Sequence, residues 1–185
     1  MYVLAHLGIG YGLVRTLVEP WRKGLPQTPI LIGTILPDLI DKPIYYGLVY
    51  FTGRRGNELG VVAGTRGFAH TAIFLVALGI AALCSTGRRA KIFEALAWGT
   101  MSHLFLDLGA DIALTQPPIF SNLPGKLHGL FWPLLGWQFP EIPYQNAYEQ
   151  IGHWVTPFSL VSELLGALIL AFFYFQYRRD QSRSV

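Results

Sequence analysis

Long apolar runs, separated by short polar or basic stretches, are the dominant pattern along this 185-residue chain. A run of about 17–25 apolar residues is long enough to cross a bilayer as a helix. The third and fifth runs fit that length, and the first two are also compatible with half-buried or re-entrant helices. The five predicted helical segments are Tyr2–Val18, Thr28–Phe51, Phe68–Ser85, Ile92–Leu114 and Phe158–Tyr177.

These segments predict an all-α protein, a polytopic membrane bundle of about four to five apolar helices. We expect one domain over residues 1–177 and a polar tail over residues 178–185. Pro37 and Pro43 are expected to break or kink the second segment. Thr115–Pro157 is rich in Pro, Gly and aromatic residues, and it predicts an extracytoplasmic lid because Trp and Tyr favour the headgroup level.

Composition supports a membrane protein. The chain is 52% hydrophobic and only 14% charged, whereas a soluble domain is about 25% charged. Its net charge is +3, and its basic residues form short clusters instead of a stripe, so nucleic-acid binding is not expected. Cys84 is the single cysteine. An internal disulfide and a zinc site of paired cysteines are therefore excluded, and any metal must be held by His, Asp or Glu.

The basic clusters predict an orientation in a cell (inner) membrane. Cytoplasmic loops carry an excess of Lys and Arg, so we expect the three clusters to be cytoplasmic and the N-terminus outside. Nine basic residues then lie inside and four outside. The inner set is Arg15, Arg22, Lys23, Arg88, Arg89, Lys91, Arg178, Arg179 and Arg183, and the outer set is Arg54, Arg55, Arg66 and Lys126.

Ionisable residues inside apolar segments usually mark function. His103 and Asp107 are four residues apart and share one helix face, so they can hold one metal ion. Imidazole with carboxylate suits zinc, manganese or iron. The alternative is a His–Asp hydrogen bond that satisfies two buried groups. Asp111 continues the same face but lies near the helix end, which favours a bystander role.

The motif "LPDLIDKP" supplies Asp38 and Asp41, and the alternative for Asp38 is to cap an ordinary helix. His70 follows Arg66 in "TRGFAHTAIF", and its alternative role is structural. Arg66 suits a phosphate or carboxylate partner, or it extends to the headgroups as an interfacial arginine.

The remaining candidates are His6, Glu163 and two lid histidines. His6 lies near the predicted outer end of the first segment, at a depth compatible with His70, His103 and Asp107. Glu163 is a candidate metal ligand, general base or hydrogen-bond acceptor between helices. His128 and His153 are either interfacial residues or further members of the site.

Taken in order, His6, "GTILPDLID", "RGFAHT", "SHLFLDLGAD" and "FWPL" resemble the YdjM-like family of predicted inner-membrane metal-dependent hydrolases. That family is distantly similar to the zinc-dependent phospholipase C and nuclease group. The late H-x-x-x-E pair of those enzymes is absent, because position 159 is a serine. The resemblance implies the metal ligands His6, Asp38, His70, His103 and Asp107, with Asp107 as a bridge between two ions.

These observations predict a hydrolase that uses one or two zinc-like ions to activate water against an ester or phosphoester. Asp38 or Asp41 would accept the proton from water, and Arg66 would neutralise negative charge. A site in the outer half of the bilayer predicts a lipid or lipid-linked substrate. The alternatives are a membrane scaffold or regulator with structural His–Asp pairs, and a small metal- or ion-permeation protein. The sequence sets no oligomeric state.

Overall fold

The computed structural model describes residues 3–114, 127, 129–137, 139, 148, 152 and 155–183, and this part of the chain contains helices and no strand. The first helix, Val3–Val18, is continuous and includes two π-helical stretches. Its pieces are α1 (Val3–Ala5), η1 (His6–Gly10), α2 (Tyr11–Leu13) and η2 (Val14–Val18). The others are α3 (Gln27–Gly33), α4 (Leu36–Thr52), η3 (Gly56–Leu59), η4 (Phe68–His70), α5 (Ala72–Leu83), α6 (Gly87–Leu114) and α9 (Pro157–Arg183).

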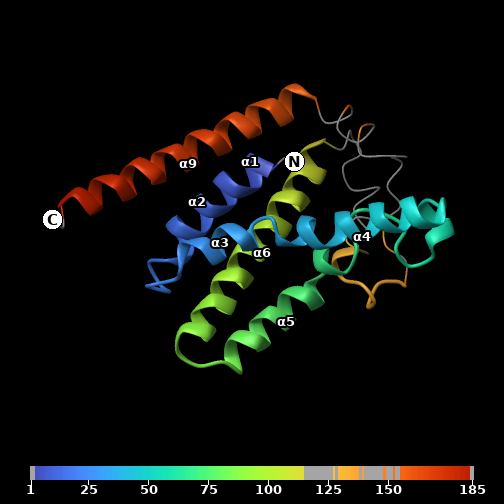
Figure 1. The fold of residues 1–185 in the computed structure, drawn as a ribbon, viewed down its shortest axis with the longest axis horizontal. Helices are drawn as coiled ribbons and strands as arrows, with labels where there is room; N and C mark the ends of the chain where they lie inside the picture. The colour runs from blue at the N-terminus through green and yellow to red at the C-terminus, as the bar shows by residue number, and fades with distance from the viewer. Residues whose placement is uncertain are drawn as a thin grey trace.

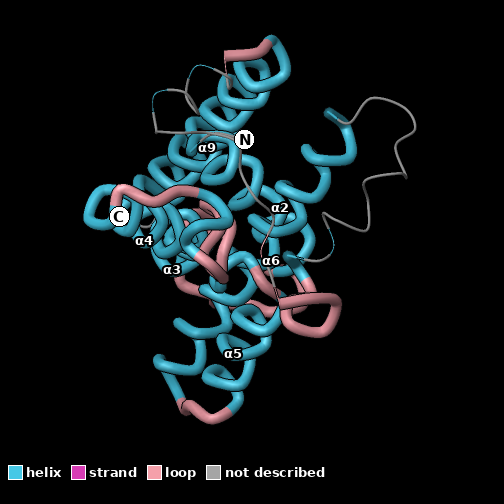
Figure 2. Tube along the Cα trace, turned by 90° about the vertical axis from the view of Figure 1, so that its right-hand side faces the viewer, coloured by secondary structure: helices cyan, strands magenta, loops and turns pink. Residues whose placement is uncertain are grey.

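Helix α6 is the central element of the bundle (Figure 1). α3 and α5 both pack on it, and α9 packs on the first helix. A short turn over residues 84–86 joins α5 to α6, so the two helices run antiparallel (Figure 2). The apolar core lies between the first helix, α3 and α6, where Tyr11, Val14, Ile30 and Ala95 are buried together.

Glycines at two crossings allow the helix backbones to approach closely. A Cβ atom on Gly33 would lie 2.5 Å from the Leu96 carbonyl oxygen, and one on Gly99 would lie 2.4 Å from the Ile30 carbonyl oxygen. A Cβ atom on Gly166 would lie 2.1 Å from the Leu4 carbonyl oxygen. Any side chain at these positions would push α3 away from α6, or α9 away from the first helix.

The second predicted segment forms two helices, and the interruption lies near only one of its two prolines. α3 ends at Gly33 and α4 begins at Leu36, with Pro37 in its first turn, where proline is well tolerated. Pro43 lies inside α4, which continues to Thr52. The prediction of a break near Pro37 is confirmed; at Pro43 a break is wrong, and a kink there stays a prediction. α4 ends at Gly53, whose φ of 68° is favourable for glycine.

By length and composition, one described helix is able to cross a membrane, Pro157–Ser182 in α9; Val3–Val18 and Ala72–Leu83 are shorter apolar helices. The bundle of four to five spans therefore stays a prediction. α6 is 28 residues long and begins at Gly87 instead of Ile92, so it includes the basic residues that we placed before the fourth segment. α9 continues to Arg183, so the boundary expected at residue 177 falls within this helix.

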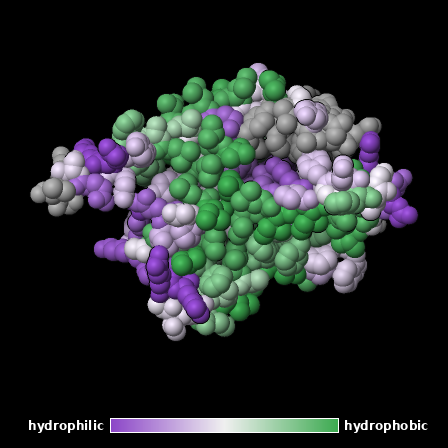
Figure 3. Space-filling model, in the orientation of Figure 1, coloured by the Kyte–Doolittle hydropathy of each residue, from purple (hydrophilic) through white to green (hydrophobic). Residues whose placement is uncertain are grey.

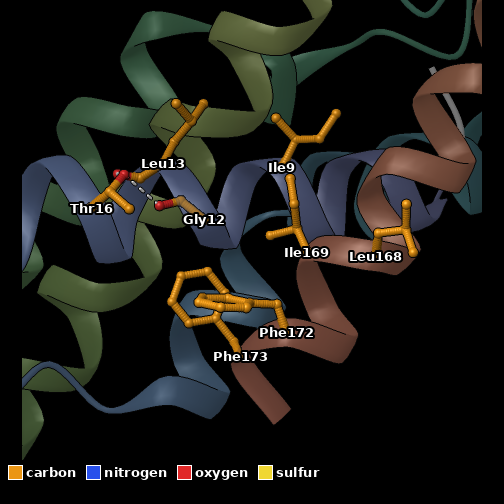
Figure 4. A pocket seen from close by; sticks show the side chains of 8 residues that line it. All are labelled: Ile9, Gly12, Leu13, Thr16, Leu168, Ile169, Phe172 and Phe173. Carbon is orange, nitrogen blue, oxygen red and sulfur yellow. Dashed lines mark hydrogen bonds between the residues drawn. The ribbon is translucent and has the colours of Figure 1, made fainter. Parts of the chain in front are cut away.

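The crossing of α9 and the first helix leaves an apolar groove of about 440 Å³ on one side of their contact. In Figure 4, Phe172 and Phe173 of α9 lie below the first helix, and Ile169 lies near Ile9. The hydroxyl of Thr16 donates to the carbonyl oxygen of Gly12 at 2.8 Å, which satisfies the one hydroxyl in this apolar surface. The groove thus presents hydrocarbon to its surroundings, as expected of a helix pair in a bilayer.

Candidate metal centre

The loop that carries His70 is held by the carboxylate of Asp41. Backbone N–H groups of Gly67, Ala69 and His70 donate to Asp41 at 2.9, 3.1 and 3.1 Å. His70 Nδ1 lies 2.7 Å from Asp41 Oδ2. With a carboxylate oxygen as its acceptor, Nδ1 is the donor, and Nε2 of a neutral His70 then carries a lone pair. Asp41 therefore fixes both the position of His70 and its tautomer.

His103 is oriented by the break between α3 and α4. Pro37 has no N–H group to donate to the Gly33 carbonyl, and the hydroxyl of Thr100 on α6 donates to that oxygen at 3.4 Å. The next carbonyl, that of Thr34, lies 2.8 Å from His103 Nδ1. A carbonyl oxygen only accepts, so Nδ1 is the donor and Nε2 of a neutral His103 also carries a lone pair.

Several pairs of ligand atoms in the cluster are separated by distances close to those found around a tetrahedral ion. Nε2 of His70 and Nε2 of His103 are 3.3 Å apart. Asp38 Oδ1 lies 3.5 Å from His70 Nε2, and Asp107 Oδ2 lies 3.7 and 3.6 Å from the His70 and His103 nitrogens. Bonds of about 2.0–2.2 Å to a tetrahedral zinc ion place its ligand atoms about 3.3–3.6 Å apart. The four measured separations, 3.3 to 3.7 Å, are close to that range.

His6 approaches the same cluster from the first helix. Its Nε2 lies 3.1 Å from Asp107 Oδ1, and its ring stacks on His103 with centroids 4.1 Å apart. His6, His103 and Asp107 form one group of potential ligands, and Asp38, His70 and His103 form another. Since Nδ1 of His103 is bound to Thr34, the two groups compete for one nitrogen. Asp107 has one oxygen toward each group, which is the arrangement of a bridging carboxylate.

Two cations border the cluster. Arg66 donates to Asp107 Oδ2 at 3.1 Å and to Asp111 Oδ2 at 2.5 Å. Lys42 donates to Asp38 Oδ2 at 2.7 Å. Burial by itself lowers the pKa of the Arg66 guanidinium, but Asp107 and Asp111 outweigh burial and raise it. Arg66 is therefore a permanent cation at the edge of the site, with a third of its side chain exposed.

The described residues around the cluster carry more negative than positive charge. With neutral imidazoles, two carboxylates are in excess, and the cluster is largely buried. An uncompensated buried charge is costly, and one divalent ion would neutralise it. The anionic residues are Asp38, Asp41, Asp107 and Asp111, and the cationic ones are Lys42 and Arg66.

The five residues that the family resemblance implied as ligands lie together in the structure: His6, Asp38, His70, His103 and Asp107. Asp41 has a different role from these five residues. Both of its oxygens accept N–H groups of the His70 loop, so it supports His70, and its role as a proton acceptor stays a prediction. Asp111 binds Arg66 and belongs to neither potential ligand group. Asp38 does not cap α4, because Ile35 occupies that position.

The carboxylate of Glu163 on α9 binds the start of the first helix. Its carboxylate accepts the N–H groups of Leu4 at 3.0 Å and Ala5 at 2.8 Å, immediately before His6. Of the roles that the sequence left open, the hydrogen bond between helices is the one observed. His128 and His153 lie outside the described residues.

Sequence reasoning missed two residues that orient ligands. Thr34 acts through its backbone carbonyl, for which no residue type is diagnostic. Lys42 lies four residues after Asp38 on one helix, and that spacing is recognisable in the sequence as an ion pair.

The described part of the chain is helical, with one helix able to cross a membrane and a buried His–Asp cluster able to hold a metal ion. The family model described as YdjM inner membrane protein matches residues 1–181. The chain belongs to the YdjM inner membrane protein family. Neither the curated proteins nor the solved structures contain a match to it.

Proposed function

We propose that the protein is a membrane-bound hydrolase that depends on a divalent metal ion. The observation that carries this proposal is the 3.3 Å separation of two imidazole nitrogens, each held as a lone-pair acceptor by a donor bond on the other side of its ring. Two lone pairs at that distance repel each other unless a cation lies between them. Asp38 and Asp107 supply negative charge at the same point.

Zinc suits this ligand set, because imidazole nitrogens and carboxylate oxygens are its usual ligands, and Asp38, His70 and His103 form one group of potential ligands. Manganese and iron accept the same atoms with other geometries. Asp107, whose Oδ2 lies 3.7 and 3.6 Å from the His70 and His103 nitrogens, is the fourth candidate ligand. A second ion beside His6 would share Asp107 through Oδ1 and would need further ligands.

A divalent ion in this position, when bound, activates water for attack and polarises an ester or phosphoester oxygen. Asp38 is the carboxylate that we assign to accept the proton from water, since Asp41 holds the His70 loop through four hydrogen bonds. Arg66, partly exposed beside Asp107, would bind the negative charge of the substrate. The choice of a phosphoester rests on the resemblance to the zinc-dependent phospholipase C and nuclease group.

The position of the cluster along α6 suggests the substrate. Lys91 and His103 are 12 residues apart, which is about 18 Å along a helix. With the basic end of α6 in the cytoplasm, the cluster lies in the extracytoplasmic half of a multi-pass protein. A lipid or lipid-linked phosphoester would reach that depth with its headgroup.

Metal content tests the proposal directly. Protein purified without chelators should contain about one equivalent of zinc, and His103→Asn and Asp107→Asn should each lose it. Asp180→Asn, which removes a carboxylate from the exposed end of α9, is the control and should keep it. Metal-free wild-type protein would refute the proposal and favour a scaffold in which a proton on one imidazole takes the place of the ion.

Activity is the second measurement. The zinc-loaded protein should hydrolyse at least one lipid phosphoester in a panel of bilayer substrates, and Arg66→Gln should raise KM more than it lowers kcat. A zinc-loaded protein that cleaves none of them would show a metal site without the proposed chemistry.

A further inference from the structure

A second groove lies between the first helix and α6 and has a volume of about 570 Å³; Leu13 borders both grooves. We name it the Trp98 groove. Leu13, Leu17 and Trp21 line it from the first helix and the following turn, and Trp98, Met101 and Phe105 line it from α6. Leu17 is 65% exposed and Phe105 66%, so the groove presents large apolar side chains that the described chain leaves uncovered.

The Trp98 groove is separate from the metal cluster. Phe105 lies two residues after His103, which is about 200° around the helix. Its residues therefore lie on the face of α6 away from His103 and Asp107. A ligand in the groove would not touch the proposed metal.

One end of the groove is basic. Arg22 is the single charged residue among the described residues that line it. Its Nε lies 3.5 Å from Glu94 Oε1, and its side chain is 63% exposed. Lys91 donates to the Lys23 carbonyl oxygen at 2.6 Å, which joins the turn after the first helix to the start of α6.

The surroundings of Arg22 extend this positive charge. The turn after the first helix and the first turn of α6 meet at this end, and hydrophilic side chains gather there at the lower left of Figure 3, next to the hydrophobic face. Residues 15–23 and 88–94 contain six basic side chains and two acidic ones. The basic residues are Arg15, Arg22, Lys23, Arg88, Arg89 and Lys91, and the acidic residues are Glu19 and Glu94.

We propose that the Trp98 groove binds an anionic phospholipid, with one acyl chain along the groove and the phosphate at Arg22. The groove residues Trp98 to Phe105 span about 10 Å of α6, which is shorter than one leaflet of hydrocarbon at about 15 Å. An acyl chain is therefore long enough to cover them. Trp21, 86% exposed next to Arg22, is in the position that aromatic residues take at the headgroup level.

The test uses the full chain in vesicles of equal phosphatidylglycerol and phosphatidylcholine. In each experiment only one of the two lipids carries bromine on its acyl chains, and bromine quenches the fluorescence of nearby tryptophans. Quenching that is present in the wild type and lost in Trp98→Phe is assigned to Trp98 in the groove. About 1 kcal/mol of attraction per basic residue near the surface corresponds to roughly fivefold enrichment of the anionic lipid. We expect brominated phosphatidylglycerol to quench Trp98 more strongly than brominated phosphatidylcholine.

Matched variants locate the phosphate. Arg22→Gln should remove most of the preference, and Arg54→Gln, which removes an exposed arginine after α4, should retain it. Glu94→Gln removes the ion-pair partner of Arg22 and should increase the preference. Equal quenching by both lipids in the wild type would overturn the proposal, and so would an unchanged preference in Arg22→Gln. Absence of Trp98 quenching by either lipid would show that no acyl chain occupies the groove.

Discussion

Asp41→Asn is the most informative perturbation of the cluster, because it changes no proposed metal ligand. In the best orientation the amide oxygen of the new side chain replaces Oδ2, which accepts from Gly67 N, His70 N and His70 Nδ1. The amide NH2 then faces the Ala69 N–H at 3.1 Å, where two donors meet. One charge-assisted hydrogen bond is lost, worth about 1.5–3 kcal/mol. The other three become neutral bonds of roughly half the strength.

The expected result has two parts. The free energy of unfolding should fall by about 3 kcal/mol, which a protein stabilised by about 5–15 kcal/mol survives. Metal affinity should fall about 10–100-fold, as is typical when the carboxylate behind a ligating His is changed. The His70 ring would be oriented less rigidly, and its Nε2 would be a weaker ligand of the ion.

Zinc affinity is measured by competition with a chromophoric chelator, and stability by thermal unfolding of both metal-free proteins. Asp180→Asn makes the same chemical change on the exposed end of α9 and should alter neither quantity. A folded Asp41→Asn protein with wild-type zinc affinity would refute the argument that Asp41 prepares His70 for a metal.

Three further changes test other parts of the protein. Glu163→Ala removes the acceptor of the Leu4 and Ala5 N–H groups and should lower stability by about 1–2 kcal/mol, measured as a lower melting temperature. Gly33→Val should separate α3 from α6 and reduce both melting temperature and zinc content; Gly79→Val, with open space around it, should change neither. Asp111→Asn removes a competitor for Arg66 and should tighten inhibition by inorganic phosphate several-fold, measured as a lower inhibition constant in the hydrolysis assay.

The sequence predicted the helical class and most helix positions because apolar length is a local property. It also predicted the cluster members His103 and Asp107 from their four-residue spacing. The two-part second segment was harder to place. Pro37 and Pro43 have the same chemistry, but only the region before Pro37 is broken, where the hydroxyl of Thr100 on α6 donates to the Gly33 carbonyl oxygen. Thr100 is 67 residues from Gly33 in the sequence, so no local sequence pattern predicts this contact.

The roles of the carboxylates depended on tertiary contacts in the same way. Asp38 and Asp41 are three residues apart on one helix, and nothing in their spacing separates a proton acceptor from a support for His70. The difference arises because the loop 67–70 presents three backbone N–H groups to Asp41, while Lys42 takes one oxygen of Asp38. Glu163 is likewise explained only by the close crossing at Gly166, which brings the start of the first helix to α9.

The cluster is assembled from four separate parts of the chain. The first helix contributes His6, α4 contributes Asp38, the loop before α5 contributes His70, and α6 contributes His103 and Asp107. Each of these side chains is buried or nearly so, in a protein whose fully buried apolar core is small. An ion that binds only the assembled site stabilises it by its binding free energy. In the proposed function, the same ion that activates water would therefore also join the first helix, α4 and the His70 loop to α6.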